Sequence, residues 1–207
     1  PTFNDLYYNF IGNTNLNPER AHLFNLGVNY GFAVNRWMSE VSVDGFYNRI
    51  QDKIVAIPTK DLFNWSMQNI GQIQATGMDA GFLVSYNEKY WKLTLNGSYT
   101  FNLSLDITNA GSSTYKKQIP YTPFHSATAG FAISYKTFGL NMTGIYSGFR
   151  YSLNENSYAN YLAPFTDLSV NLSKQITLAK EGLLRINVAA MNVLNKNYEV
   201  IRSFPMP

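Results

Sequence analysis

Long stretches in which apolar and polar side chains alternate one by one constrain this chain more than any other feature. Between Tyr90 and Leu103, every second residue from Trp91 onward is large and apolar except Gly97, and the residues between them are Lys, Thr, Asn or Ser. A period of two residues is typical of a β-strand with one apolar and one polar face. The same pattern predicts eight strands, at Ala21–Phe32, Trp37–Ile50, Gly77–Tyr86, Tyr90–Leu103, His125–Tyr135, Phe138–Gly148, Asp167–Ile176 and Leu183–Val193.

The connections between these strands alternate between short and long. The short ones are polar and suit hairpins, at 34–36, 87–89, 136–137 and 180–182. The long ones are rich in Asn, Ser, Tyr, Gly and Pro, at 51–70, 105–124 and 151–164, and the end segments 1–19 and 195–207 are similar. Compact domains rarely repeat such long connections. Short turns at one end of the strands and long loops at the other are typical of an outer-membrane β-barrel.

The strand lengths agree with a membrane barrel. A strand of about 13 residues rises about 3.3 Å per residue, and a tilt of about 45° brings its span to about 30 Å, the thickness of the hydrocarbon layer. Aromatic residues also lie near the ends of the apolar runs, as in the girdles at membrane interfaces. They are Phe32, Trp37, Tyr86, Trp91, Tyr135, Phe138 and Tyr146. The alternative is that these rings pack a soluble core, but the opposite faces are consistently polar.

Composition narrows the class of protein further. Charged residues make up 14% of the chain, against about 25% in ordinary soluble domains, and its 24 asparagines make it polar without making it ionic. The mean hydropathy of −0.18 and the lack of a long apolar run exclude a bundle of membrane helices. The net charge of +3 is spread thinly, with no basic run longer than Lys116–Lys117, so nucleic acid is not an expected partner. Without cysteine, disulfides and thiolate metal sites are excluded.

Eight strands that start from an outer loop return the chain to the same side, so both chain ends are expected among the long loops. A small closed barrel has its ends at the short turns. We therefore expect an all-β, antiparallel, up-and-down transmembrane segment of about eight long strands, taken from a larger barrel and forming one domain over 1–207.

Both ends of the chain carry motifs of a known family. Pro1–Tyr8 (PTFNDLYY) is followed by Gly12–Glu19 (GNTNLNPE), and Asn187–Glu199 (NVAAMNVLNKNYE) is followed by Ser203–Pro207 (SFPMP). These segments resemble TonB-dependent outer-membrane receptors, late in the barrel and just before its last strand. Thr14 stands where the family usually has proline. The motifs cover the ends of the chain, and the hairpin rhythm between them fits the same family.

The resemblance implies strands 14 to 21 of a 22-stranded barrel, with the N-terminal plug domain, the TonB box and the last strand outside this chain. It implies a receptor in the outer membrane of a Gram-negative bacterium that imports a ferric siderophore or related iron chelate, energised through TonB. The implied partners are outer-membrane lipid, TonB through the plug, and a metal-chelate or vitamin ligand. Cobalamin and haem uptake are alternatives, although no histidine lies between Pro1 and Leu16, where haem receptors of the family tend to carry one.

Enzymatic chemistry is not predicted. The chain lacks HExxH, GxSxG and P-loop motifs, and we expect no cofactor and no metal site. His22 and His125 lie at strand starts, far apart in sequence. His22 could ligate haem iron, but an interfacial role is more usual for a histidine at a barrel rim. Glu40 and Asp44 share the polar face but are about 13 Å apart on a strand, so we expect charges that line the bore and face Arg or Lys from neighbouring strands or the plug. The Asn-x-Ser matches at Asn64, Asn96 and Asn102 follow from polar alternation.

The long loops are the predicted ligand-binding region. Receptors for large, scarce ligands need rigid aromatic area and a few hydrogen-bond donors. The candidate residues are Phe63, Trp65, Tyr115, Tyr121, Arg150, Tyr151, Asn156, Tyr158 and Tyr161. The alternative for at least half of these aromatics is packing of one loop on another.

Two functions of other classes remain open. One is a surface adhesin or structural barrel that presents its loops to other macromolecules without transport. The other is a soluble carbohydrate-binding β-sandwich, which predicts a monomer that needs no detergent, whereas an open sheet with two bare edges predicts aggregation or edge pairing.

Overall fold

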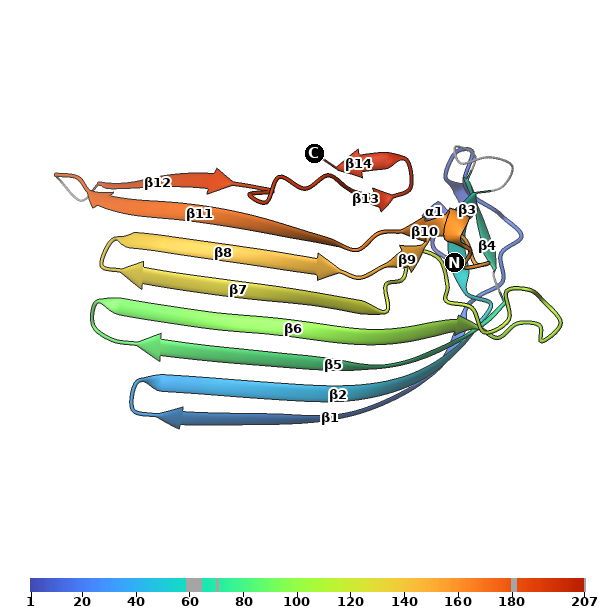
Figure 1. Cartoon of the computed structure of the whole chain (residues 1–207), viewed down its shortest axis with the longest axis horizontal. Coiled ribbons are helices and arrows are strands. Elements are labelled where there is room, and N and C mark those ends of the chain that lie inside the picture. The colour runs from blue at the N-terminus through green and yellow to red at the C-terminus, as the bar shows by residue number, and fades with distance from the viewer. Residues whose placement is uncertain (59–64, 70, 180–181, 207) are drawn as a thin grey trace.

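A single eight-stranded antiparallel sheet dominates the computed structural model, which describes residues 1–58, 65–69, 71–179 and 182–206 (Figure 1). Its strands pair in the order β1-β2-β5-β6-β7-β8-β11-β12. They are β1 (Arg20–Val34), β2 (Trp37–Gln51), β5 (Gln72–Asn87), β6 (Trp91–Asp106), β7 (His125–Tyr135), β8 (Phe138–Ser147), β11 (Phe165–Thr177) and β12 (Leu183–Ala190). All eight predicted strands are confirmed, with differences only at their ends.

Shorter elements occupy the segments that were expected to be loops. They are α1 (Phe3–Tyr7), β3 (Ile54–Pro58), β4 (Trp65–Asn69), β9 (Arg150–Tyr151), the 3-10 turn η1 (Tyr158–Asn160), β10 (Tyr161–Leu162), β13 (Tyr198–Ile201) and β14 (Phe204–Met206). β3 pairs with β4, β9 with β10, and β13 with β14. The helix α1 forms because Thr2 and Asp5 make a capping box at its start. We call the end of the sheet that carries the long connections the loop end, and the other the turn end.

The strand register places unlike residues on the two faces of the sheet. Cross-strand pairs join Val28, Val43, Ala80, Tyr99, Ala127 and Tyr146 into one row, on what we call the apolar face. The row on the opposite, polar face joins Asn29, Ser42, Gly81, Ser98, Thr128, Ile145 and Asp167. The Ser98 and Thr128 hydroxyls in that row share a hydrogen bond of 2.7 Å. The predicted facing of the strands is therefore confirmed.

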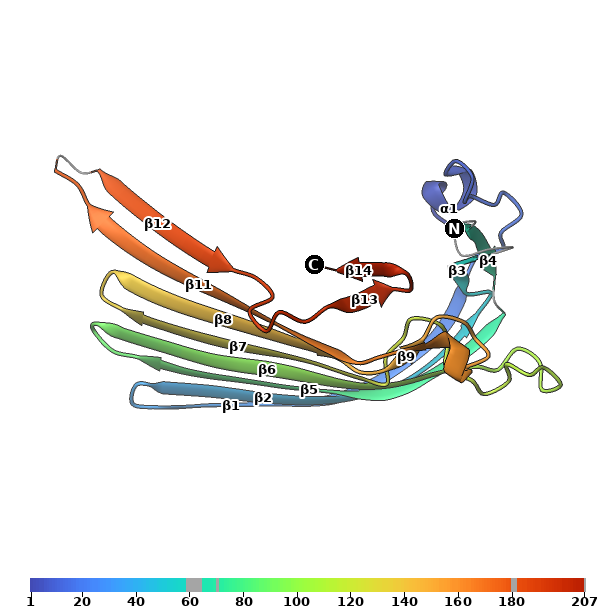
Figure 2. The ribbon, with the colours of Figure 1, turned by 45° about the horizontal axis from the view of Figure 1, so that its top comes forward.

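Neither face of the sheet encloses a conventional core. Among the described residues, the buried hydrophobic side chains are only Leu16, Ile73, Ala75 and Leu162, whereas Leu26 on the apolar face is 83% exposed. The other sheets in the described part are two-stranded hairpins, so the second large sheet of a β-sandwich is not found there. The sheet is curved and not closed (Figure 2), with β1 and β12 at its edges. In the described ranges, no helix is long and apolar enough to cross a membrane.

The two faces exchange character near the loop end. Gln72 and Gln74 lie on the apolar face, while Ile73 on the polar face is buried. This exchange explains why apolar alternation predicted a start at Gly77 although β5 begins at Gln72. On β1 the apolar run extends from Phe24 to Val34, ten steps of about 3.3 Å, or about 25 Å at a tilt of about 40°. That height matches the apolar band of outer-membrane barrels, about 25 Å.

Candidate functional site

The candidate site lies at the loop end, where the connection from β8 to β11 folds into β9, η1 and β10 (Figure 1). Backbone hydrogen bonds join this connection to the preceding one, since the Tyr121 N–H donates to the Tyr151 carbonyl at 2.7 Å. The Ser152 N–H donates to the Asn160 carbonyl at 2.8 Å and closes the β9–β10 turn. These hydrogen bonds therefore fix the two long connections to each other at the loop end of the sheet.

An aromatic cluster forms the centre of this region. Tyr151 and Tyr161 meet edge to face with ring centroids 6.3 Å apart, and Tyr158 stacks on Tyr161 at 6.5 Å with an interplanar angle of 9°. Phe149 stacks on Tyr161 at 5.8 Å and contacts Phe124 at 5.2 Å. Three predicted residues thus come together, and Phe124 and Phe149 are additions that sequence reasoning missed. Their signal in the sequence is an aromatic residue at each end of the β7–β8 hairpin, flanking His125 and Arg150.

Exposure within the cluster is uneven. The Tyr158 ring is 95% exposed, whereas Tyr161 is 40% exposed and Tyr151 is half-buried. An exposed ring that lies parallel to a second, supported ring offers flat apolar area to a ligand. A cleft of about 220 Å³ lies beside it, lined by Tyr161, Leu162, Ala163, Pro164, Asn197, Tyr198 and Glu199.

Trp65 and Tyr121 form a second aromatic pair, with ring centroids 6.3 Å apart. The pair brings β4 against the connection between β6 and β7 and is linked to the cluster through the Tyr121–Tyr151 backbone hydrogen bond. Burial raises the pKa of the Tyr121 hydroxyl, which stays protonated at neutral pH. Tyr115 lies in the same connection, where the Lys116 ammonium is 5.6 Å from its ring centroid. Phe63 lies outside the described residues.

Arg150 is a structural residue in this arrangement. The residue is 3% exposed, and its guanidinium donates to the carbonyl oxygens of Glu199 and, at 3.1 Å, of Val200. It also lies 5.3 Å from the centre of the Phe165 ring. Burial lowers the pKa of Arg150, although the guanidinium keeps its charge. The side chain predicted as a ligand donor thus ties β13 to β9, and a ligand would reach it only after displacing that hairpin.

Asn156 also bonds to the protein itself. Its amide accepts from the Gln118 N–H at 2.7 Å and donates to the Gln118 carbonyl at 2.8 Å. The Gln118 side chain is 1% exposed and accepts from the Ser104 N–H at 2.9 Å. The Asn156 side chain therefore joins the β8–β11 connection to the β6–β7 connection through the same pair of hydrogen bonds that a neighbouring strand backbone would make.

Asp106, at the end of β6, links the same loops and was missed by sequence reasoning. Its buried carboxylate accepts from the Thr108 N–H at 2.9 Å, the Thr114 hydroxyl at 2.9 Å and the Asn154 amide at 2.7 Å. The first of these contacts is an Asx turn, whose signal is an Asp directly after a strand. The contacts with Thr114 and Asn154 join residues that are further apart in sequence, so no local pattern predicts them.

Three acidic side chains, Glu40, Asp44 and Asp79, lie on the polar face of the sheet. Glu40 accepts from the Asn29 amide at 2.8 Å, and Asp79 accepts from the Thr100 hydroxyl. Asp44 lies opposite Asp79 in the β2–β5 register. In the described part of the chain the ion pairs are Arg36–Glu88 and Lys53–Glu19, so Glu40 and Asp44 pair with no described Arg or Lys. The expectation that basic side chains of neighbouring strands or the plug face them stays a prediction.

The two histidines are accounted for differently. The His125 Nδ1 atom and the Tyr99 hydroxyl are 2.7 Å apart, and the His125 ring packs on Tyr99 and Phe101. His22 is exposed near the start of β1 and lies opposite Arg49 in the β1–β2 register. Over the ranges that the structure describes, no group of three or more metal-ligating side chains comes together.

An open antiparallel sheet with one apolar face, one polar face and ordered loops at one end is the wall of a transmembrane β-barrel. Comparison with known proteins then defines the family. The family described as TonB dependent receptor-like, beta-barrel, matches residues 1–195, so the chain belongs to this family. The predicted resemblance is confirmed.

Individual relatives are similar over nearly the whole chain. The vitamin B12 transporter BtuB of Photobacterium profundum is 26% identical over 204 residues, which are 96% of this chain and 30% of the relative. The copper transporter OprC has a TM-score of 0.63 at 15% identity, with coverage of 96% and 30%. The ferric-catecholate import receptor Fiu from Escherichia coli K12 has a TM-score of 0.61 at 16% identity, with coverage of 95% and 26%. The chain thus spans about a third or less of these proteins, and the structural matches show the shared fold.

Proposed function

We propose that this chain is part of the barrel wall of an outer-membrane receptor that imports a ferric siderophore or related iron chelate, energised through TonB. The chain contributes a single barrel segment over 1–207, in the outer membrane of a Gram-negative bacterium. Its role is to bind and pass on a ligand without changing it chemically. The strongest support is the exposed, parallel Tyr158–Tyr161 ring pair at the loop end.

This pair has the properties of a ligand platform. Tyrosine loses few rotatable bonds on binding, and it provides both a flat ring and a hydroxyl donor. The planar aryl groups of many iron chelates match the ring, and their oxygen atoms match the hydroxyl. The loops beneath are fixed by buried polar contacts at Asp106 and Gln118, which lowers the ordering cost of binding.

Cobalamin is the second candidate ligand. The relative at 26% identity is named a vitamin B12 transporter. Cobalamin is also a large ligand with a flat ring system, so the same platform suits it. The ferric-catecholate and copper transporters that share the fold are consistent with metal cargo but select no ligand.

The test is binding and uptake by cells that make the intact receptor. We expect radioiron-labelled ferric siderophore to bind and to be taken up only when TonB is present. Replacing Tyr158 and Tyr161 together with Ala should weaken binding by about ten- to thirty-fold, the usual effect of removing an aromatic anchor that the ligand buries when it binds. Tyr158→Phe, which keeps the ring, should retain most of the affinity if stacking dominates.

Controls separate the alternatives. Tyr8→Ala removes an exposed tyrosine outside the cluster and should leave binding unchanged. Saturable binding of labelled cyanocobalamin, without binding of ferric chelates, would replace the siderophore by the vitamin. Uptake of neither cargo, together with adhesion that is independent of TonB, would contradict the receptor and favour the adhesin.

A further inference from the structure

One lysine interrupts the apolar face near the turn end. Lys174 lies between Leu172 and Ile176 on β11, and the register places all three on the apolar face. The membrane-facing side of a barrel strand is a costly place for a charge near the bilayer centre but not at its interface. The transport function proposed above makes no use of this residue.

Register pairs place Lys174 in a row of aromatic side chains. Trp91 pairs with Tyr135, Tyr135 with Phe138, Phe138 with Lys174, and Lys174 with Ile186. Trp91 and Tyr135 are in contact, with ring centroids 4.4 Å apart. The Lys174 ammonium lies 3.5 Å from the Phe138 ring centroid and donates to the Thr137 hydroxyl at 2.8 Å. Lys174 thus directs its charge toward the turn, as lysines do at a membrane interface.

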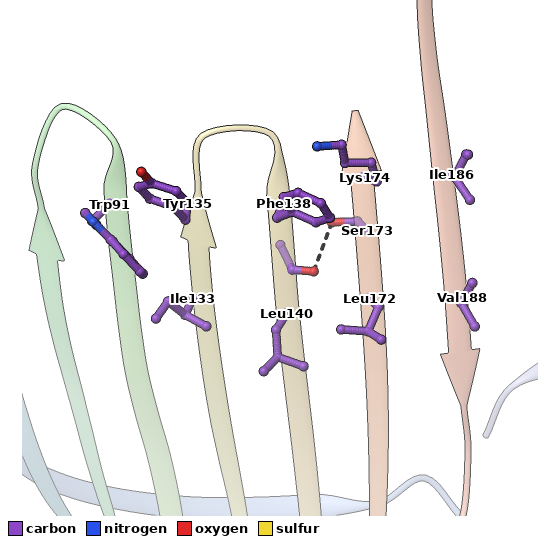
Figure 3. A pocket seen from close by; sticks show the side chains of 11 residues that line it. Trp91, Ile133, Tyr135, Phe138, Leu140, Leu172, Ser173, Lys174, Ile186 and Val188 are labelled. Atoms are coloured by element: carbon purple, nitrogen blue, oxygen red, sulfur yellow. Dashed lines mark hydrogen bonds between the residues drawn. The ribbon is translucent and has the colours of Figure 1, made fainter. Parts of the chain in front are cut away.

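A groove of about 340 Å³ begins at the row that contains Lys174 and extends over a neighbouring row of aliphatic side chains (Figure 3). The next row away from the turns is Ile133, Leu140, Leu172 and Val188, again joined by register pairs. The groove therefore has a cationic and aromatic end toward the turns and an aliphatic floor toward the middle of the sheet. Its volume lies in the range of small-molecule sites, about 300–1,000 Å³.

Further positive charge surrounds the cationic end. The Lys136 ammonium is 5.2 Å from the Tyr135 ring centroid and 5.4 Å from that of Tyr90, and the Lys89 ammonium is 5.2 Å from Tyr90. Glu88, the acidic residue of the described turns, is already paired with Arg36. In the described ranges, none of the three lysines has a carboxylate within ion-pair distance.

We propose that this groove binds one anionic phospholipid, with an acyl chain along the aliphatic row and its phosphate beside Lys174 and Lys136. Charge complementarity selects an anionic headgroup, and the aliphatic floor selects a lipid over a free anion. Lys174 leaves its contact with Thr137, or shares it, when it donates to the phosphate. The inference depends on the membrane placement given under Proposed function, but it concerns a different face and a different ligand.

The experiment measures lipid retention by the intact receptor purified in a non-ionic detergent. After delipidation, phosphatidylglycerol and phosphatidylcholine with identical acyl chains are added, and bound lipid is counted by native mass spectrometry. We expect at least a five-fold preference for phosphatidylglycerol. Lys174→Gln should weaken phosphatidylglycerol retention about five-fold, and the Lys136→Gln, Lys174→Gln double variant about twenty-five-fold, from the usual effect of one basic side chain at an anionic surface.

Lys92→Gln is the matched control, because Lys92 follows Trp91 at the same height but lies on the polar face. It should leave retention unchanged. Leu172→Trp, which fills the groove, should lower retention of the lipid while leaving thermal unfolding of the receptor unchanged.

Equal retention of the two lipids, or equal effects of Lys92→Gln and Lys174→Gln, would overturn the lipid site. Release of phosphatidylglycerol by excess inorganic phosphate would show an anion site rather than a lipid site and would also overturn it. A protein that purifies as a monomer without detergent would instead contradict the membrane placement itself. Loss of the lipid preference with intact siderophore uptake would remove this inference alone.

Discussion

Leu95 and Asn96 are consecutive residues of β6 with opposite surroundings. Leu95 pairs with Val84 and Phe131 on the apolar face. Asn96 lies on the polar face, where its side chain covers Gly130 closely enough that a Cβ on this glycine would lie 2.4 Å from the asparagine oxygen. In a barrel wall, the first side chain contacts acyl chains and the second contacts water in the bore.

Arginine at these two positions should therefore have unequal effects. Leu95→Arg is expected to lower the free energy of unfolding of the intact receptor by about 2–4 kcal/mol, because the charge enters the apolar band near its middle. Asn96→Arg should cost much less, since its guanidinium extends into water. Equilibrium unfolding in lipid vesicles measures both, and similar losses would contradict the assignment of the faces.

Residue type predicted that aromatic side chains gather in the loops, but it did not predict which groups the polar loop side chains bind. Tyr151, Tyr158 and Tyr161 do form a cluster. Arg150 and Asn156, in contrast, satisfy backbone groups of segments 49 and 38 residues away in sequence. A guanidinium or an amide serves a ligand and a loop equally well, so only the three-dimensional arrangement distinguishes the two uses. Whether the tyrosines bind ligand stays a prediction.

At the scale of elements, alternation predicted every long strand, because the two faces of the sheet keep opposite polarity along most of each strand. The β3–β4 hairpin was predicted as loop, since it lies beyond the span, where that pattern is lost. Contacts with the first segment of the chain hold it instead. The Met67 N–H donates to the Ile11 carbonyl at 2.9 Å, and the Asn13 amide donates to the Met67 carbonyl at 3.0 Å.

Glu19 links the same two segments and should make their association depend on pH. Its carboxylate accepts from the Ile54 N–H at 2.6 Å and pairs with the Lys53 ammonium at 2.9 Å. Partial burial raises the pKa of Glu19, but these two donors outweigh burial and hold the pKa below its usual value. A carboxyl with a lowered pKa stabilises the folded state above its unfolded pKa, about 4.3 for Glu. That stabilisation is lost as the pH falls through the lower folded value.

We therefore expect the Ile54 amide to keep its protection against hydrogen exchange at neutral pH and to lose it as the pH falls from about 4.3 through the lowered pKa of Glu19, after correction for intrinsic exchange rates. Glu19→Gln keeps a hydrogen-bond acceptor but removes the titration, so its protection should be lower than wild type at neutral pH and nearly independent of pH. The same pH profile in both proteins would rule out Glu19 as the titrating group.

At the scale of the whole molecule, a sheet this long is stable only if something covers its apolar face and its two edges. The apolar band of about 25 Å matches a bilayer, and the family match over residues 1–195 places the sheet in a larger barrel wall. The membrane placement that we propose assigns exposed apolar residues such as Leu26 and Val28 to lipid contacts and not to a misplaced core. The motifs at the two ends of the chain predicted the family, but no pattern in the sequence selects the cargo.

Accessibility of spin labels along β6 tests this account most directly. Single cysteines are placed in the intact receptor at positions 93–96, 98 and 99, spin-labelled and reconstituted in vesicles. The labels report collision with oxygen, which concentrates in lipid, and with a water-soluble nickel chelate. We predict alternation at every residue, with oxygen favoured at Leu93, Leu95 and Tyr99 and nickel favoured at Thr94, Asn96 and Ser98. Low access of both reagents on both faces, as in a dry protein interior, would contradict the account.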